Sequence, residues 1–245
     1  MTLIFVPLLQ VQRDLYAMPR GMERFRTYIR TMTDAESGDL ALPLVAMNPM
    51  GKDHVPALLD AYLTLGAEAV AAEAVAQAAR DLSQVSGGFK VGLVLSDDLK
   101  GGWTNRYCAE FSHRIEGRAI TKRGWATGLL WTSEAPSVPA VRDAVLTSIY
   151  RVAFQQGSSA PPVTLGDMLD QEGTAMAHAG CTSPSLTDDD LAYTRAIIEP
   201  LRTVTDRATV MACLFGDNAA RALGYPPQGL SDRAGLALAL HDARL

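Results

Sequence analysis

The chain has 245 residues and a formal net charge of −5, from 22 Lys and Arg residues against 27 Asp and Glu residues. Its content of 48% hydrophobic and 20% charged residues is typical of a globular protein and excludes a disordered tail, a collagen-like fibre and a coiled-coil rod. The acidic balance argues against a general nucleic-acid coat and against a polybasic membrane binder.

The N-terminal residues 1–9 are apolar, but they have no basic leader and no small-residue cleavage site, so they do not predict a signal peptide. No window approaches the roughly 20 apolar residues that a membrane span requires. The three cysteines, Cys108, Cys181 and Cys213, lie at long, irregular spacings and do not suggest a disulfide framework. We therefore expect a cytoplasmic protein without a membrane segment.

In the first third of the chain, apolar residues at three- and four-residue steps predict a helix over 21–33. The apolar run 40–47 is broken by Pro43, which predicts an edge strand or an extended segment. The alanine-rich stretch 56–82 predicts two helices that are separated at Gly66.

The middle of the chain alternates between strand and helix patterns. The clearest strand is 89–95, and it is followed by a helix over 104–116, a second strand over 125–132 and a long helix over 139–156. This order is typical of a parallel α/β unit with a right-handed crossover.

The last 80 residues show only helical patterns. Thr164 is expected to begin one helix, and Thr187, which is followed by three aspartates, is expected to begin another. Two further helices are expected over 205–223 and 231–245.

The fold class predicted from these patterns is α/β, with a small, mainly parallel sheet flanked by helices and an all-helical C-terminal region. We expect an α/β core over 1–157 that carries the site, and a helical region over 158–245 that packs on this core as part of one compact domain. The small-residue faces of the helices over 57–82 favour a homodimer.

The functional site is expected where the strands end, because open parallel sheets bind ligands beyond the carboxyl ends of their strands. If 42–47 joins the sheet in parallel with the two clearer strands, three loops meet there: 48–54, 96–106 and 132–134. All three loops are rich in polar residues of catalytic type.

The loop 96–106 and the helix after it carry the largest group of candidate ligand-binding residues. Gly101 and Gly102 allow the backbone to approach a ligand closely. Asn105 and Arg106 begin the helix, and we expect the planar guanidinium of Arg106 to hold a carboxylate or phosphate through two bonds. Glu110 lies one turn further along the same face, and the alternative reading of Arg106 and Glu110 is an ordinary i,i+4 ion pair.

Asp97 and Asp98 follow the strand 89–95 and are candidates for acid/base chemistry. Adjacent residues on an extended chain point to opposite faces, so we do not expect a close carboxylate dyad. One of them could act as a general base or hold a hard divalent cation, which would need help from Glu134 or Glu110. Whether a metal or another cofactor is bound stays open.

Lys52 and His54 lie ahead of the helical stretch that starts near Pro56. Gly51-Lys52 resembles a phosphate-binding turn only loosely, because Asp53 stands where that motif requires Ser or Thr. Either Lys52 and His54 bind an anion or pass a proton at the positive helix end, or Asp53 caps the helix and the other two are solvated.

A short basic stripe is present in the predicted helix 21–33 and just before it, formed by Arg20, Arg24, Arg26 and Arg30. The stripe is short and the whole chain is acidic, which argues against nucleic-acid binding. We expect these arginines to pair with acidic helices or to line a pocket for an anionic ligand.

Two hypotheses from different classes follow. The first is an enzyme, a hydrolase or lyase, that acts on a small anionic organic molecule; Arg106, Lys52 and helix N-termini bind the anion, and Asp97 or Asp98 serves as acid and base with His54 or Glu110. The second is a non-catalytic helical accessory protein that binds a partner protein, because no recognised catalytic motif is present and the C-terminal third is helical.

Overall fold

A computed structural model describes residues 1–99 and 105–245 of the chain. The described part divides into two compact units, 1–110 with 116–149, and 111–115 with 150–245. The sequence predicts a boundary after residue 157, whereas the units meet within a helix at residue 149. The candidate site lies entirely in the first unit.

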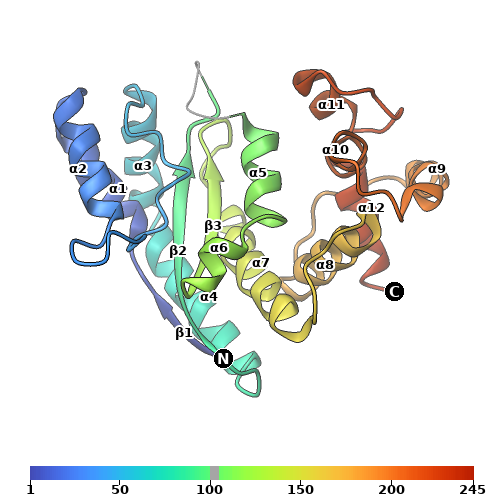
Figure 1. Ribbon diagram of the computed structural model, residues 1–245, viewed down its shortest axis with the longest axis horizontal. Helices are drawn as coiled ribbons and strands as arrows, with labels where there is room; N and C mark the ends of the chain where they lie inside the picture. Colours follow the sequence, from blue (N-terminus) through green and yellow to red (C-terminus); the bar gives the residue numbers. More distant parts are fainter. Residues whose placement is uncertain (100–104) are drawn as a thin grey trace. The chain divides into compact units, whose positions relative to one another are not determined.

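The first unit is an α/β layer around a three-stranded parallel sheet with the strand order β1-β2-β3 (Figure 1). Its elements are β1 (Thr2–Phe5), α1 (Leu8–Ala17), α2 (Met22–Met32), α3 (His54–Thr64), α4 (Ala67–Asp81), β2 (Gly88–Ser96), α6 (Arg118–Lys122) and β3 (Trp125–Trp131). Two further helices, α5 (Arg106–Arg114) and α7 (Val138–Gly157), begin in this unit and end in the second. The small parallel sheet flanked by helices confirms the fold class.

Both faces of the sheet are covered. A Cβ atom on Gly128 of β3 would lie 2.7 Å from the carbonyl oxygen of Ala144 in α7, and one on Gly92 of β2 would collide with Leu8 of α1. Because Gly128 pairs with Leu93, and neighbouring residues along β2 point to opposite faces, α7 and α1 pack on opposite faces of the sheet. Only glycine permits these close approaches of helix to strand.

The alanine-rich helix α4 packs within the chain. Ala67, Ala71, Ala74 and Ala78 are fully buried, and α4 lies against β1 and β2. The small-residue face of this helix is therefore used inside the first unit and is not available for the contact from which we expected a homodimer. The oligomeric state itself stays a prediction.

Two expectations about strands need correction. The stretch 40–47 is not a strand: only Leu40 forms an isolated bridge, with Thr33, and the rest consists of turns that bury Leu44 and Met47. The run is apolar because it is buried, and apolar composition alone does not distinguish a buried turn from a strand. The third strand is instead β1, at the start of the chain.

All secondary-structure elements of the second unit, among its described residues, are helices. Its elements after α7 are α8 (Leu165–His178), α9 (Asp188–Ile198), the short 3₁₀ helix η1 (Glu199–Leu201), α10 (Arg207–Phe215), α11 (Asp217–Leu223) and α12 (Ala234–Asp242). Thr164 caps α8 in a capping box with Asp167, and Thr187 caps α9, as the sequence predicts. Helix α12 is buried at every residue over 234–240, which explains its apolar sequence on all sides.

Within the described ranges, no single helix is long and apolar enough to cross a membrane, and only α3 and α4 taken together reach that length and apolarity, as a pair bent by 58°.

A buried ion triad stabilises the second unit. The Glu172 carboxylate is fully buried and accepts hydrogen bonds from Arg151 Nε at 2.6 Å and from Arg114 Nη1 at 2.6 Å. Burial alone would raise the pKa of Glu172, but the two guanidinium groups outweigh it and lower the pKa to about 2. Since the pKa is depressed from its ordinary 4.5, this stabilisation is complete above about pH 4.5 and is lost as the pH falls towards about 2.

We predict that Glu172→Gln lowers the free energy of unfolding by about 3–5 kcal/mol at neutral pH, because it leaves two buried guanidinium groups without their counter-charge. The variant should also lose the part of the acid sensitivity between pH 4.5 and 2 that Glu172 causes. Urea denaturation at a series of pH values measures both effects. The control is Asp170→Asn, which removes an exposed ion pair with Arg202 and should cost less than about 1 kcal/mol; equal losses in the two variants would contradict the prediction.

Candidate functional site

The candidate site is a polar network where β2 and β3 end, at the upper edge of the sheet in Figure 1. Asp97 and Asp98 follow β2, while Thr132, Ser133 and Glu134 follow β3. The backbone N–H of Thr132 donates to the carbonyl of Ser96 at 3.1 Å, which continues the pairing of the strands by one residue. This pairing places the two loops side by side.

Asp97 is the most buried carboxylate of the network, with 2% of its surface exposed. Its Oδ2 accepts a hydrogen bond from Asn48 Nδ2 at 2.8 Å, and its Oδ1 lies 2.8 Å from His54 Nε2. The hydroxyl of Thr132 lies 3.2 Å from the same Oδ1. The carboxylate is thus surrounded by donors, which compensates for its removal from water.

Asn48 and His54 reach Asp97 from the segment between α2 and α3. Asn48 is held by its own neighbours, since its side-chain oxygen accepts from the Met50 N–H at 3.0 Å and its carbonyl accepts from the buried hydroxyl of Tyr16. Burial, together with the nearby Asp97, raises the pKa of the Tyr16 hydroxyl, so this hydroxyl remains a donor at neutral pH.

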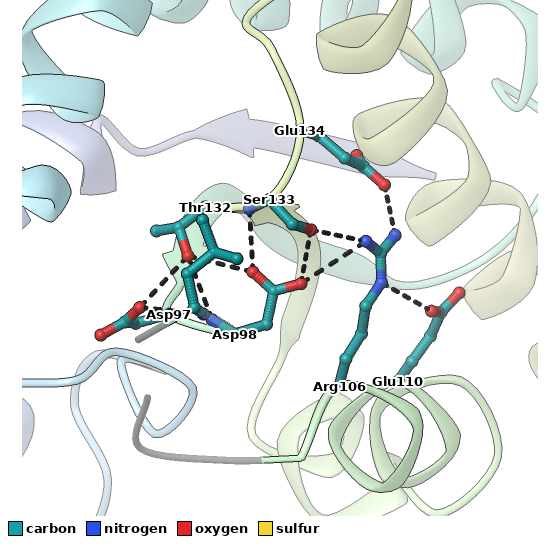
Figure 2. A network of polar contacts seen from close by, with 8 residues as sticks. Asp97, Asp98, Arg106, Glu110, Thr132, Ser133 and Glu134 are labelled. Carbon is teal, nitrogen blue, oxygen red and sulfur yellow. Dashed lines mark hydrogen bonds and ion pairs between the residues drawn. The ribbon is translucent and has the colours of Figure 1, made fainter. Parts of the chain in front are cut away.

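Asp98 faces a different set of partners, as the alternation of side chains along a strand predicts. Its Oδ1 accepts from the Ser133 N–H at 2.9 Å, and its Oδ2 accepts from the Ser133 hydroxyl at 2.6 Å. Thr132 connects the two aspartates: its hydroxyl also lies 3.0 Å from Asp98 Oδ1 and accepts from the Asp98 N–H at 3.1 Å (Figure 2). One hydroxyl hydrogen therefore serves two carboxylates.

Arg106 is the cation of the network and is in contact with three carboxylates (Figure 2). Its Nη1 donates to the Ser133 hydroxyl at 2.9 Å and lies 3.5 Å from Asp98 Oδ2, and its Nη2 donates to Glu134. Its Nε is 3.9 Å from Glu110 Oε2. The guanidinium carbon also lies 5.0 Å from the centre of the Trp131 ring, which adds a cation–π contact.

The network carries more negative than positive charge. In the part of the chain that the structure describes, it contains four carboxylates (Asp97, Asp98, Glu110 and Glu134), one guanidinium and one imidazole. No group of three or more His, Cys, Asp or Glu side chains among these residues has the arrangement of a metal site.

The structure brings together five of the residues proposed from the sequence: Asp97, Asp98, His54, Arg106 and Glu110. Asn105 instead caps α5, because its side-chain oxygen accepts from the Cys108 N–H at 3.2 Å. Lys52 is exposed, and Asp53 forms no side-chain capping bond to α3. Gly101 and Gly102 lie outside the described residues.

Several residues of the site are not predicted from the sequence. Thr132, Ser133, Asn48 and Tyr16 have common polar side chains, and the sequence gave a signal only for Thr132, Ser133 and Asn48, through their place in the loops 132–134 and 48–54. Tyr62 of α3 is fully buried, and its hydroxyl has no hydrogen-bond partner among the residues described. Burial and the nearby Glu134 raise its pKa to about 12.

The basic stripe is divided in the structure. Arg24 is buried, donates to the Met18 carbonyl from Nε at 2.9 Å and lies over the Tyr16 ring, whereas Arg30 is exposed and 3.6 Å from Glu23. The four arginines therefore do not form one continuous basic surface along this helix. Arg24 instead contacts Tyr16, whose hydroxyl donates to Asn48.

Comparison with known protein families, curated proteins and solved structures finds no match for this chain. The functional argument therefore depends on the geometry of the site.

We predict that Thr132→Val lowers the free energy of unfolding by about 1–3 kcal/mol, because the isosteric side chain leaves the Asp98 N–H without its acceptor and removes a donor from two carboxylates. Urea denaturation at neutral pH measures the loss. Thr203→Val, at an exposed turn of the second unit, is the matched control and should change stability by less than about 0.5 kcal/mol. A Thr132 variant as stable as the control would show that the hydroxyl does not hold the network together.

Proposed function

We propose that this chain is an enzyme, a hydrolase or lyase, that performs acid/base chemistry on a small anionic organic molecule. The observation that carries the proposal is the pairing of His54 with the buried Asp97 at the carboxyl edge of the sheet. Arg106, in the same network, is proposed to bind the anionic group of the substrate.

The pairing with Asp97 gives His54 the geometry of a general base. A neutral imidazole has one nitrogen that donates and one that accepts. When Nε2–H donates to the Asp97 carboxylate, the lone pair is on Nδ1, a buried atom that has no hydrogen-bond partner within residues 1–99 and 105–245, so a substrate or water molecule must enter the site to reach it. Nδ1 is then the atom that takes a proton from a substrate or a water molecule, and Asp97 stabilises the imidazolium that forms.

The fixed position of Asp97 supports the same role. A carboxylate that orients a catalytic imidazole must itself be held, and here Asn48 and Thr132 hold it from two sides. His54 is the first residue of α3, and its side chain is 15% exposed. The positive end of α3 lies there too and favours a bound anion.

One observation favours the competing proposal of a non-catalytic accessory protein that binds a partner protein. The guanidinium of Arg106 is already surrounded by Asp98, Glu110 and Glu134, an arrangement that would also serve a purely structural role. The two proposals differ in what binds: a small anion stabilises the enzyme, whereas a partner protein co-purifies in a fixed ratio with the accessory protein.

We propose a cytoplasmic location, supported by three cysteines that are free in the structure, two of them buried. A homodimer and a bound divalent cation are also compatible with the enzyme proposal, and neither is needed for the role of His54.

We predict that a small anion stabilises the wild-type chain and that Arg106→Lys weakens its binding about tenfold, which corresponds to roughly 1.4 kcal/mol, because lysine keeps the charge but loses the planar fork. Thermal-shift titrations with acetate, succinate, citrate and inorganic phosphate measure this binding. Failure of all four anions to stabilise the wild type, together with recovery of a partner protein in a fixed ratio, would favour the accessory protein.

We further predict that His54→Gln binds a compound consumed by the wild type with an affinity within about twofold of the wild type. The variant should no longer consume this compound, because only proton transfer is removed. Proton NMR of the mixture over time measures the turnover. His178→Gln in the second unit is the matched control, since His178 is bonded only to a backbone carbonyl of its own helix in addition to its ring contact with Tyr150, and it should leave turnover unchanged. Equal turnover by the two variants would refute the role of His54.

A further inference from the structure

Glu134 differs from the other carboxylates that surround Arg106. The side chains of Asp98 and Glu110 are each only 5% exposed, whereas that of Glu134 is 42% exposed. Asp98 and Glu110 are therefore confined by the protein around them, and Glu134 is held to Nη2 of Arg106 from the solvent side (Figure 2).

Arg106 also has contacts that do not involve Glu134. Nη1 is bonded to the Ser133 hydroxyl and lies near Asp98, Nε faces Glu110, and the guanidinium lies over the Trp131 ring. These contacts fix the guanidinium plane from the buried side. If the Glu134 side chain moves into solvent, Nη2 stays in place and is left with an unmet donor.

We infer that Glu134 occupies the position of the substrate's own carboxylate, and that the substrate is a small monocarboxylate which replaces Glu134 on Nη2 of Arg106. This inference rests on the proposed function, in which Arg106 binds the anion. It adds the substrate class and a residue that sets specificity, because a ligand must compete with Glu134 to bind.

The charge of the network selects the class of ligand. When one carboxylate replaces another on Nη2, the charge next to Asp98 and Glu110 is unchanged. A phosphate group, with about −1.5 to −2 charges at neutral pH, would add negative charge beside Asp98 and Glu110, two buried carboxylates that already contact this guanidinium. The site therefore favours a carboxylate over a phosphate of the same size.

The test is chemical rescue of Glu134→Ala, which vacates the position on Nη2. We expect acetate and formate to bind this variant at least tenfold more tightly than the wild type, and to raise its melting temperature in a saturable way. Inorganic phosphate at the same ionic strength should bind less tightly than acetate. The double variant Glu134→Ala/Arg106→Lys should lose the gain, because the acetate then has no guanidinium to bind.

The matched control is Asp39→Ala, which also removes a carboxylate from an arginine. Its partner Arg123 is 39% exposed and the Asp39 side chain is 54% exposed, so a vacated Arg123 offers acetate only a solvated contact. If Glu134→Ala gains no more acetate affinity than Asp39→Ala, the exchange is refuted. If phosphate binds Glu134→Ala as tightly as acetate does, the substrate class is refuted.

Glu134→Gln keeps the length of the side chain and provides a second variant if the alanine variant does not fold. It should show a smaller gain of acetate affinity than Glu134→Ala, about threefold over the wild type, and no gain at all would refute the exchange. Failure of the exchange is distinguishable from failure of the proposed function. If turnover requires His54 but the Glu134 variants bind acetate no more tightly than the wild type, only the exchange is refuted. If the Glu134 variants bind acetate more tightly through Arg106 but turnover does not require His54, only the catalytic role is refuted.

Discussion

The buried amide of Gln12 is the interaction on which the site depends. Strand β1 pairs with β2 only over 88–91, so the β1 side of β2 lacks a strand partner from there to its end. Odd-numbered residues of β2 direct their backbone groups to that side: the Val91 carbonyl accepts from the Val6 N–H, and the carbonyl of Gly87, just before β2, accepts from the Thr2 N–H. At Leu95, Gln12 replaces the missing strand: Nε2 donates to the Leu95 carbonyl at 3.0 Å, and the Leu95 N–H donates to Oε1 at 2.9 Å. Both groups are thereby satisfied in a fully buried position, and β2 can continue to Ser96 beneath α1.

The arrangement of the site follows from this extension of β2. Because β2 and β3 remain paired up to Ser96 and Thr132, the chain leaves both strands at the same level, and Thr132 lies beside both aspartates. Asp97 then lies on the side of α1 and α3, where Asn48 and His54 approach, and Asp98 lies on the side of Arg106. A carboxylate buried in this way is destabilising unless donors surround it, and most of these donors are neutral: an asparagine amide, two hydroxyls and backbone N–H groups. Neutral donors hold the carboxylates without cancelling their charge, which leaves that charge to act on His54 and Arg106.

The sequence predicts strands β2 and β3 and the loops that follow them, because an apolar run bounded by Gly, Ser and Asp is a strong local pattern. It does not predict β1, which has only four residues at the edge of the sheet and alternates between half-buried and exposed positions. The expectation that 48–54 lies beside the second loop rested on a strand over 40–47 that does not exist; the segment arrives there because buried turns and the contact of Tyr16 with Asn48 place it. Gln12 could not be selected from the sequence, and for Thr132 only its place in a loop at the site could be predicted, since the roles of both residues depend on groups that are distant in the chain. The capping role of Asn105 has a local reason, because Asn is among the residues preferred just before the first turn of a helix.

If Arg106 binds an anion as proposed, the carboxylates that contact it restrict which anions it can bind. A lone arginine on a surface attracts any anion, but one that already faces Asp98 and Glu110 has little positive potential left for a dianion. What it retains is direction, because the Trp131 ring and Ser133 hold the guanidinium plane so that Nη2 faces the exposed Glu134. In the proposed exchange, a ligand gains one charge-assisted hydrogen bond on Nη2 and is favoured only if it brings no more negative charge than Glu134 removes. The buried carboxylates that contact the arginine would then also weaken the binding of more highly charged anions.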